Sequence, residues 1–471
     1  MTTEAASDID FTPATEADMP FIRQMIEDEL LDDERLEAEQ FITIREDGRI
    51  VAFGRVKPYE HTFELGSVCV APDARSRGLG EAIIRELVRR FPQDDVFLTT
   101  NRKVGLPAYY ERLGFLLTND LPEELEAKCE RIRSKGLLDP VGMVYDRNYD
   151  RLPTLADVYG AKHVLEGQLQ PTPLLHNPRM SRELGFEAYL KLENLQPIGA
   201  FKVRGGVNLC STLTNEERER GIIGASTGNH GQSLAYGANL CGMRCIIVMP
   251  EEANPMKVES MKALGAEVRF QGDNFEEARR WAEEHAESTG MRYVHHVNSP
   301  ALIAGVATMS LEIVEALPDV DVIITPIGGG SGAIGHCLVA KKLKPGVQVI
   351  GVQAAGATAV YNAWRERTLQ TGAIHTAAEG LATGQAYYAP VRYFIERLDD
   401  MLLVSEDEMR DAVVRLARSA HIVAEESGAA STAAAVQIAE RLAGKKVAII
   451  VSGGNITPDH LRRILLDTQT S

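Results

Sequence analysis

The chain of 471 residues is too long for one ordinary hydrophobic core, so we expect two or more domains. Hydrophobic residues make up 44% of the sequence and charged residues 25%, as in globular proteins, and no apolar run approaches the length of a membrane span. The net charge of −17 argues against nucleic acid or an anionic membrane surface as a partner.

The chain begins with MTTEAASDID, which is acidic rather than signal-like. Its six cysteines are scattered without a CxxC pair. Cys241 and Cys245 are four residues apart, but no histidine or second pair accompanies them, so buried thiols are favoured over a zinc site. These observations predict a protein of the reducing cytoplasm.

Acidic residues are concentrated in the first third of the chain. Residues 1–150 contain 31 acidic and 19 basic residues, and the remainder contains 36 and 31. The excess is largest in EDELLDDERLEAE at 27–39. A solvated helical face is the simpler interpretation of this segment, and a rim that attracts a cationic amine substrate is the alternative.

Strand-like and helical segments alternate in the first 148 residues. FITIRE, GRIVAFGRVK and ELGSVCV have strand character, and EAIIRELVRRF is amphipathic with a helical period. The segment DRNYDRLPTLADVY at 146–159 is the predicted joint. The sequence therefore predicts two α/β domains, at 1–148 and 149–471.

A glycine-containing turn lies between one of these strands and the helix. Arg75, Arg77, Gly78 and Gly80 form RSRGLG, whose glycines expose backbone amides at a helix start, where an anion can bind. On its own this turn is a weak signal. The strand and proline directly before it, and NRKVGLPAYYERLGF at 101–115, strengthen it. Together these segments resemble the GNAT acetyltransferase superfamily.

The GNAT resemblance implies a mixed sheet covered by helices and a binding site for acetyl-CoA. It places the pyrophosphate on the amides around Arg75–Gly80 and the pantetheine beside the strand Val68–Val70, and it places Asn101 near the cofactor arm. Tyr110 stands where the family often has a general acid that protonates the CoA thiolate. A phenol with a pKa of about 10 suits a thiolate with a pKa of about 8.5.

Glu64, just before the binding strand, is the candidate base that deprotonates the acceptor amine, through a water molecule. An exposed strand carboxylate without catalytic function is an equally good interpretation. PEELEAKCE at 122–130 weakly resembles the acetylglutamate synthase type, which does not identify the acceptor.

In the second part of the chain, apolar strands alternate with helices. RCIIVMP is followed by the helical NPMKVESMKALG and the short strand AEVRF, while DVIITPI and KVAIIVS end in glycine-rich turns. Buried parallel strands have this character, and ligands are expected at their carboxyl ends.

Four motifs in this part carry chemistry: KLENLQPIGAFKVRGG at 191–206, ASTGNHGQS at 225–233, PIGGGSGAIG at 326–335 and SGGN at 452–455. A structural turn needs one or two glycines, whereas the third motif has four in five positions and forms an anion-binding concavity at a helix start. In this order the motifs resemble the pyridoxal-phosphate enzymes of fold type II, in the threonine/serine dehydratase and serine racemase branch. The resemblance covers about two thirds of the chain and implies a two-subdomain α/β fold like that of the tryptophan synthase β-subunit.

The resemblance assigns the cofactor contacts residue by residue. Lys202 matches the lysine that forms the Schiff base with pyridoxal phosphate and then removes the α-proton, and Phe201 beside it contacts the cofactor. Ser452 matches the partner of the ring nitrogen and Asn229 the partner of the ring hydroxyl. The phosphate is held by Gly328, Gly329, Gly330, Ser331 and Gly332, where the serine replaces the usual fourth glycine.

The same match places the substrate carboxylate on the asparagine loop, at Ser226, Thr227, Gly228 and His230. A histidine after the asparagine resembles the dehydratases, because the cysteine-synthase relatives typically have threonine there. This difference makes β-replacement chemistry the weaker prediction.

One match and two departures from the family's sequence predict the chemistry of this domain. A hydroxyl at Ser452 does not hold the pyridine firmly protonated, so the cofactor is a milder electron sink that favours β-elimination. Thr227 stands where serine racemases place the serine that acts on the opposite face of the α-carbon, which disfavours racemisation. Gln353 and Ala359 stand where relatives have carboxylates that bind a divalent cation, so we predict no metal there.

The predicted function is bifunctional. The second domain eliminates water from a β-hydroxy-α-amino acid such as threonine, serine or a hydroxylated diamino acid, giving a 2-oxo acid and ammonia. The first domain acetylates a distal amine, because an acetylated α-amine cannot react with pyridoxal phosphate. The alternatives are a non-catalytic first domain that senses acetyl-CoA or aids assembly, and β-replacement or racemisation in the second. Relatives of the second domain are commonly dimers, so a homodimer is expected.

Overall fold

The computed structural model describes residues 9–29, 31–59, 62–91, 95–102, 106–134, 139–145, 152–251, 255–297 and 299–467. They divide into two compact units, Met1–Asp150 and Arg151–Ser471. The predicted domain boundary between residues 148 and 149 falls in 146–151, outside the described residues. Each unit is described by itself.

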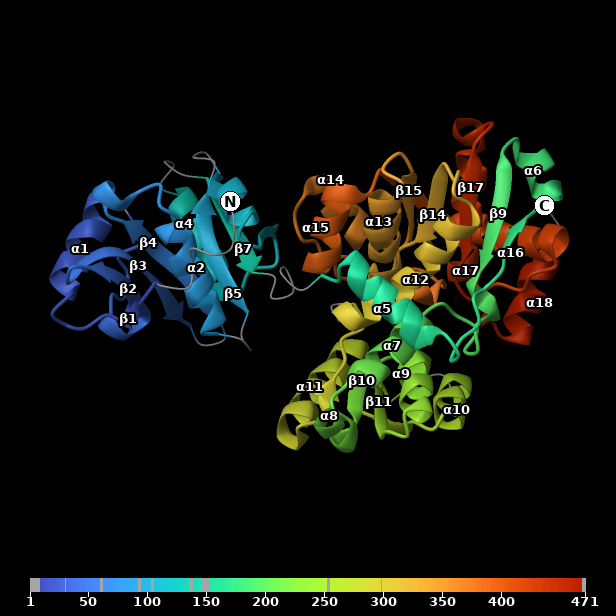
Figure 1. Ribbon diagram of the computed structural model, residues 1–471, viewed down its shortest axis with the longest axis horizontal. Helices are drawn as coiled ribbons and strands as arrows, with labels where there is room; N and C mark the ends of the chain where they lie inside the picture. The colour runs from blue at the N-terminus through green and yellow to red at the C-terminus, as the bar shows by residue number, and fades with distance from the viewer. Residues whose placement is uncertain are drawn as a thin grey trace. The chain divides into compact units, whose positions relative to one another are not determined.

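The first unit is built on a mixed seven-stranded sheet in the order β1-β2-β3-β4-β5-β7-β6. Neighbouring strands are antiparallel except β4 and β5, which are parallel. The strands are β1 (Phe11–Pro13), β2 (Phe41–Glu46), β3 (Arg49–Pro58), β4 (Phe63–Val70), β5 (Val96–Asn101), β6 (Phe115–Thr118) and β7 (Pro140–Tyr145). The helices are α1 (Met19–Asp28), α2 (Leu79–Arg89), α3 (Leu106–Glu111) and α4 (Glu123–Ser134). The strands predicted at FITIRE and ELGSVCV are confirmed (Figure 1).

The parallel pair β4 and β5 separates in the middle of this sheet. Among the described residues they are paired only at Phe63–Val96 and Glu64–Phe97, although β4 continues to Val70. The end of β4 is still paired on its other side, where Val70 lies opposite Ala52 of β3. The edge of β4 that faces β5 therefore has backbone groups available to a ligand beyond Glu64.

Helix α2 follows β4 through the RSRGLG turn. Gly78 is the N-cap residue and has a φ of +81°, a conformation that glycine adopts without strain. Leu79, Ile83 and Leu87 recur at the helical period and are buried against β3 and β4. This packing fixes the start of α2 at the carboxyl end of β4.

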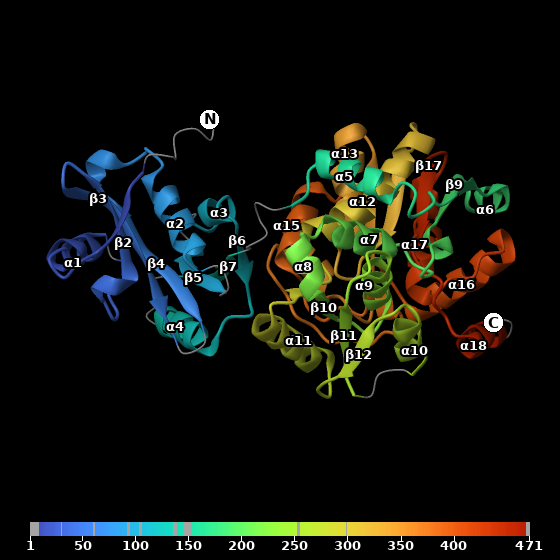
Figure 2. The ribbon, with the colours of Figure 1, turned by 60° about the horizontal axis from the view of Figure 1, so that its bottom comes forward.

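The second unit contains two sheets (Figures 1 and 2). The four-stranded sheet β12-β11-β10-β13 is entirely parallel. The six-stranded sheet β16-β15-β14-β17-β9-β8 is parallel except for the edge strand β8. The strands are β8 (Leu174–His176), β9 (Glu187–Leu192), β10 (Ile222–Ala225), β11 (Cys245–Met249), β12 (Glu267–Phe270), β13 (Arg292–Tyr293), β14 (Val322–Pro326), β15 (Gln348–Ala354), β16 (Asp400–Val404) and β17 (Lys446–Val451).

Helices cover both sheets, as βαβ connections require. They are α5 (Leu155–Leu165), α6 (Pro178–Leu184), α7 (Val203–Thr212), α8 (Asn215–Arg220), α9 (Asn229–Leu240), α10 (Pro255–Ala263), α11 (Phe275–Thr289), α12 (Pro300–Ala316), α13 (Ser331–Leu343), α14 (Ala359–Glu366), α15 (Tyr388–Arg397), α16 (Glu406–Ala420), α17 (Glu426–Gln437) and α18 (Pro458–Asp467). The strands and helices predicted at 244–270, 321–327 and 446–452 are confirmed. No helix within the described ranges is long and apolar enough to cross a membrane.

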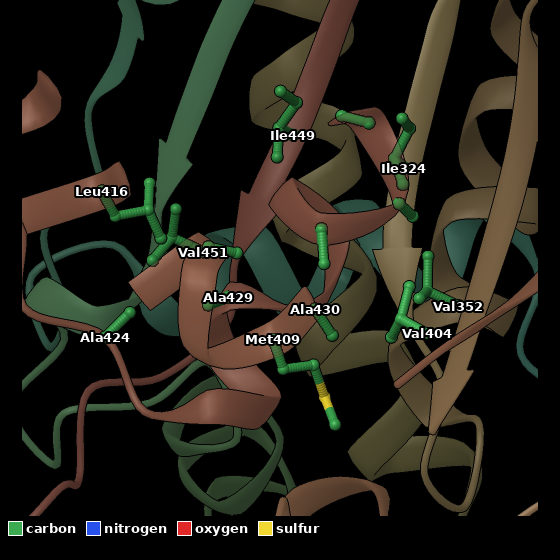
Figure 3. Close-up of a cluster of buried hydrophobic side chains, with 14 of the residues drawn as sticks. Ile324, Val352, Val404, Met409, Leu416, Ala424, Ala429, Ala430, Ile449 and Val451 are labelled. Atoms are coloured by element: carbon green, nitrogen blue, oxygen red, sulfur yellow. The ribbon is translucent and has the colours of Figure 1, made fainter. Parts of the chain in front are cut away.

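The six-stranded sheet holds the main hydrophobic core on the face that α17 covers (Figure 3). Alternate strand residues such as Ile324 and Val352 point to this face and are fully buried. Ala429 and Ala430 of α17 lie against them and, being small, allow the helix to approach the sheet closely. The close packing fixes where α17 begins, next to the carboxyl ends of the strands.

Candidate functional site

A cavity of about 940 Å³ lies in the second unit, and all four sequence motifs line it. Ser226 follows β10, Gly328 follows β14 and Ser452 follows β17, so the cavity lies at the carboxyl ends of parallel strands. Lys202 comes from the turn before α7. The predicted cofactor and substrate residues of this unit are therefore brought together in one site.

Lys202 is held over the glycine loop. Its Nζ donates a hydrogen bond to Ser331 Oγ at 2.8 Å and lies 5.3 Å from the centre of the Phe201 ring. Burial lowers the pKa of Lys202 to about 8. A substantial fraction of this amine is therefore neutral near physiological pH and able to act as a nucleophile or a base.

Helices α7 and α9 fix the lysine relative to the asparagine loop. A Cβ on Gly206 would lie 2.1 Å from the Ser233 carbonyl oxygen, and one on Gly237 would lie 2.5 Å from the Gly206 carbonyl oxygen. Ser233 Oγ also donates to the Lys202 carbonyl oxygen at 2.6 Å. Only glycine permits this backbone contact, which accounts for the second glycine of AFKVRGG.

The glycine loop fits a phosphate group. It precedes α13, whose N-cap residue is Gly330 with a φ of +106°. A Cβ on Gly328 would lie 2.1 Å from the Gly380 carbonyl oxygen, so the loop accepts no side chain there. Backbone amides at the start of a 13-residue helix bind anions. The residues present thus suit the phosphate of pyridoxal phosphate, with the amine of Lys202 beside it.

The asparagine loop is organised by its own hydrogen bonds. Ser226 Oγ accepts from the amides of Gly228 and Gly231 at 3.2 and 2.9 Å. To bind a substrate carboxylate as predicted, the Gly228 amide would have to donate to the carboxylate instead of to Ser226 Oγ, and the Ser226 hydroxyl would have to donate to it as well. Thr227 lines the cavity between them, and its role stays a prediction.

His230 lies in the wall of the same cavity. Burial, together with the positive charge of Lys202, lowers the pKa of His230 to about 3, so the ring is neutral. Its Nε2 is buried without a hydrogen-bond partner among the described residues. The His230 ring is therefore a neutral part of the cavity wall.

Ser452 directly follows the last residue of β17 and lines the cavity. Its carbonyl oxygen accepts from the Phe201 amide at 3.0 Å, which joins it to the lysine turn. Its hydroxyl donates weakly to the Ser427 carbonyl oxygen at 3.4 Å. This bond is long enough for the hydroxyl to turn toward a heterocyclic nitrogen at little energetic cost.

A buried ion network supports the lysine turn from behind. Arg204 donates to Glu193 at 2.8 Å and to Glu312 at 2.6 Å, and Lys191 pairs with Glu312. Burial alone would lower the pKa of Arg204, but the two carboxylates reverse this and raise it. The guanidinium therefore stays charged two residues from Lys202.

Among the cavity residues that the sequence-based assignment did not include are Lys257, Glu425 and Asn455. Asn229 Nδ2 donates to Glu425 at 2.9 Å, and Asn229 Oδ1 accepts from Asn455 at 2.7 Å. Asn455 lies within the SGGN motif, so its place near the cavity could be predicted from the sequence. Lys257 and Glu425 stand in segments without a recognisable pattern.

At the positions where a divalent cation was considered, Gln353 is fully buried and its Oε1 accepts from the Tyr361 amide at 2.8 Å. Ala359 begins α14. The described residues contain no group of three or more histidine, cysteine, aspartate or glutamate side chains that could hold a metal ion.

In the first unit, the predicted acetyl-CoA turn leads directly into α2. Arg75 and Arg77 are half exposed and pair with Glu29 and Glu46, each at 2.5 Å. An anion bound at the turn would compete with these carboxylates for the arginines. Asn101 ends β5, and its Oδ1 accepts from the Asp139 amide at 3.3 Å.

Tyr110 is partly buried and packs against the hydrophobic core of this unit. Its ring contacts Tyr109 and Phe115, and burial raises the pKa of Tyr110 to about 12. The expected value of about 10 was therefore too low, because the packing removes water from the phenol. Tyr109 lies closer to the turn: a Cβ on Gly80 would be 3.5 Å from its hydroxyl oxygen.

Glu64 is not an exposed strand carboxylate, so that interpretation was wrong. It is 2% exposed and accepts from Thr99 at 2.6 Å, from Lys128 at 2.7 Å and from Tyr59 at 3.0 Å. It lies at the point where β4 and β5 separate. Any function as a base must work through these partners.

The acidic segment also differs from expectation. Helix α1 ends at Asp28, so the segment at 27–39 is not one helical face. Asp32 turns inward and binds Lys57 at 2.9 Å and Lys128 at 2.7 Å. Although burial alone would raise the pKa of Asp32, these lysines hold it well below the usual range. This carboxylate neutralises buried cations and takes no part in an acidic rim.

Comparison with family models finds two matches. Residues 165–453 match the family described as pyridoxal-phosphate dependent enzyme, and residues 8–115 match the acetyltransferase (GNAT) family. Each matched range falls within one of the two units.

Curated and solved relatives match the second unit. An L-threonine ammonia-lyase of Thermotoga maritima is 39% identical over 316 residues, which cover 66% of this chain and 78% of the relative. The processed form of threonine deaminase isoform 2 from Solanum lycopersicum superposes with a TM-score of 0.63 at 28% identity, over 68% of this chain and 91% of that one. Serine racemase from Dictyostelium discoideum superposes with a TM-score of 0.62 at 33% identity, over 65% and 99%.

Proposed function

This chain belongs to the pyridoxal-phosphate-dependent enzyme family, and from that premise we propose that its second unit eliminates water from a β-hydroxy-α-amino acid. Threonine and serine are the first candidates, and a hydroxylated diamino acid is the third. The observation that carries the proposal is the buried amine of Lys202, whose pKa is lowered to about 8 and which is hydrogen-bonded to the anion-binding glycine loop at Ser331.

Pyridoxal phosphate, when bound, withdraws electrons from the substrate α-carbon and so weakens the bond to the α-proton. Gly328–Gly332 would hold its phosphate through the start of α13, and Asn229 and Ser452 would bind the polar atoms of its ring. Lys202 Nζ would take the α-proton and deliver a proton to the departing hydroxyl. The low pKa of Lys202 suits both transfers near neutral pH.

Solved relatives include enzymes named for deamination and for racemisation, at nearly equal TM-scores. The residue at position 227 favours deamination. Racemisation needs a second proton carrier on the opposite face of the α-carbon, and Thr227 offers a bulkier and less mobile hydroxyl than serine.

Product analysis tests this proposal. We expect the purified protein to release a 2-oxo acid and an equal amount of ammonia from L-threonine, L-serine or a hydroxylated diamino acid. Release of a D-amino acid without ammonia would indicate racemisation. Formation of a substituted amino acid from an added nucleophile would indicate β-replacement.

For the first unit we propose acetyl transfer from acetyl-CoA to an amine remote from the α-carbon. The separation of β4 and β5 and the amides of the RSRGLG turn support this proposal, as does membership of this unit in the GNAT family. The reason for the remote amine is chemical: acetylation of the α-amine would block its reaction in the second unit. A homodimer in the cytoplasm stays a prediction.

We expect Tyr110→Phe to lower the rate of acetyl transfer to candidate diamines about 10²-fold, because the phenol would no longer protonate the CoA thiolate. Tyr109→Phe is measured in parallel, because its hydroxyl lies beside the RSRGLG turn, and loss of the rate in that variant alone would assign the acid to Tyr109 instead. Calorimetric titration with acetyl-CoA accompanies the rate assay. Tight binding without transfer to any amine would leave a sensing or structural role and overturn the catalytic one.

A further inference from the structure

Glu425 lines the cavity but lies outside the four sequence motifs. It is the N-cap residue of α17, and its amide donates to the Gly453 carbonyl oxygen at 3.2 Å. A Cβ on Gly453 would lie 2.2 Å from Glu425 Oε1. The carboxyl group thus lies directly on the backbone that follows Ser452.

Hydrogen bonds link this carboxyl group to Asn229, Asn455 and Ile198, and the donor and the acceptor of each bond are determined. The Ile198 carbonyl oxygen can only accept, and it takes a hydrogen from Asn455 Nδ2 at 2.8 Å. Because Nδ2 faces Ile198, the same nitrogen donates to Asn229 Oδ1 at 2.7 Å. This fixes the amide of Asn229, whose Nδ2 then donates to Glu425 at 2.9 Å.

The second hydrogen on Asn229 Nδ2 is left for the cavity. An amide nitrogen carries two hydrogens, and only one is used by Glu425. Asn229 therefore presents a donor to a ligand, which suits a negatively charged ring oxygen. Glu425 is the acceptor that holds the amide in this orientation.

The charges around Glu425 have opposing effects. Burial raises the pKa of Glu425, and the repulsion of Glu426 acts in the same direction, while the amide of Asn229 and the ammonium of Lys257 lower it. Glu426 is itself paired with His460 of α18, and Lys257 of α10 is paired with Glu379. Burial prevails, so the neutral carboxylic acid persists to higher pH than for an ordinary glutamate.

We propose that Glu425 is a positioning residue for the ring hydroxyl of pyridoxal phosphate, acting through Asn229. In its neutral form it fixes Asn229 as a donor toward the ring oxygen. When it ionises, it adds a negative charge beside that oxygen and favours the protonated, uncharged oxygen. The inference rests on the proposed binding of pyridoxal phosphate and not on the identity of the substrate.

The absorbance spectrum of the holoprotein tests this inference without any substrate. As the pH is raised above the ordinary range of a glutamate, the wild-type ratio of the two cofactor bands should change, with the band of the uncharged ring oxygen growing as Glu425 ionises. In Glu425→Gln the side chain still accepts from Asn229 but never ionises. Its band ratio should therefore keep the wild-type low-pH value at every pH.

Glu276→Gln is the matched control. Glu276 lines the same cavity, but its carboxylate is half exposed and binds Arg279 at 2.8 Å. This variant should follow the wild-type pH profile. A Glu425→Gln profile that coincides with the wild type would overturn the inference while leaving the proposed function intact. A wild-type protein that acquires no cofactor band would overturn both.

Cofactor affinity gives a second measurement. Reconstitution of the apoprotein of Glu425→Ala should require an about tenfold higher concentration of pyridoxal phosphate, because the Asn229 amide keeps its bond to Asn455 but loses the bond to Glu425. Glu425→Gln should bind with the wild-type constant. Equal affinity of all three proteins would contradict the positioning role.

Discussion

Replacement of Lys202 by alanine should lower the rate of 2-oxo acid release at least 10³-fold, an order-of-magnitude expectation for loss of a residue that is both nucleophile and base. No other described amine is hydrogen-bonded to the glycine loop at Ser331. The glycine loop and Asn229 remain, so the variant should still bind the cofactor non-covalently. Initial rates with the best substrate, together with a circular dichroism spectrum, measure the effect.

Lys257→Ala is the control for this variant. Lys257 lines the same cavity and its pKa is also lowered by burial, but it pairs with Glu379 rather than with the glycine loop. The control should keep covalently bound cofactor. Near-normal turnover by Lys202→Ala in a folded protein would remove Lys202 from the mechanism.

The second large effect concerns stability. Arg204→Met should destabilise the second unit by about 3–5 kcal/mol, because Glu193 and Glu312 would lose the cation that neutralises them in the interior. Glu193 is fully buried, so water cannot replace the guanidinium. Denaturant unfolding, followed by the loss of bound cofactor absorbance, measures the change.

Arg220→Ala provides the comparison, since Arg220 pairs with Glu216 on the exposed helix α8. A surface pair of this kind contributes about 0–1 kcal/mol. If Arg204→Met and Arg220→Ala unfold at the same denaturant concentration, the buried network does not stabilise the lysine turn.

Much of the second unit follows from sequence patterns, because its strands are buried on both sides. Short apolar runs followed by glycines, such as 321–327 and 446–452, favour central parallel strands, and the turns that follow such strands lie at one edge of the sheet. That geometry brings Ser226, Gly328 and Ser452 to one cavity. Lys202 was singled out by the resemblance of AFKVRGG to a family motif, and the glycines around it argued only against an exposed helical lysine.

The polar interior was much less predictable. Asp32 and Glu64 stand in segments that favour surface positions, and their burial depends on cations from β3 and α4 that are remote in sequence. Glu425 likewise reaches Asn229 across 196 residues. Such pairs have no periodicity along the chain, so only the three-dimensional structure identifies them.

We propose that Lys202 forms the covalent bond to pyridoxal phosphate in an eliminating enzyme. Borohydride reduction of the holoprotein, followed by peptide mass spectrometry, tests it most directly. We predict a single reduced pyridoxyl-phosphate adduct on the peptide that contains Lys202 and none on the peptide that contains Lys257. An adduct on Lys257, or cofactor that reduction leaves unattached to any lysine, would contradict the account.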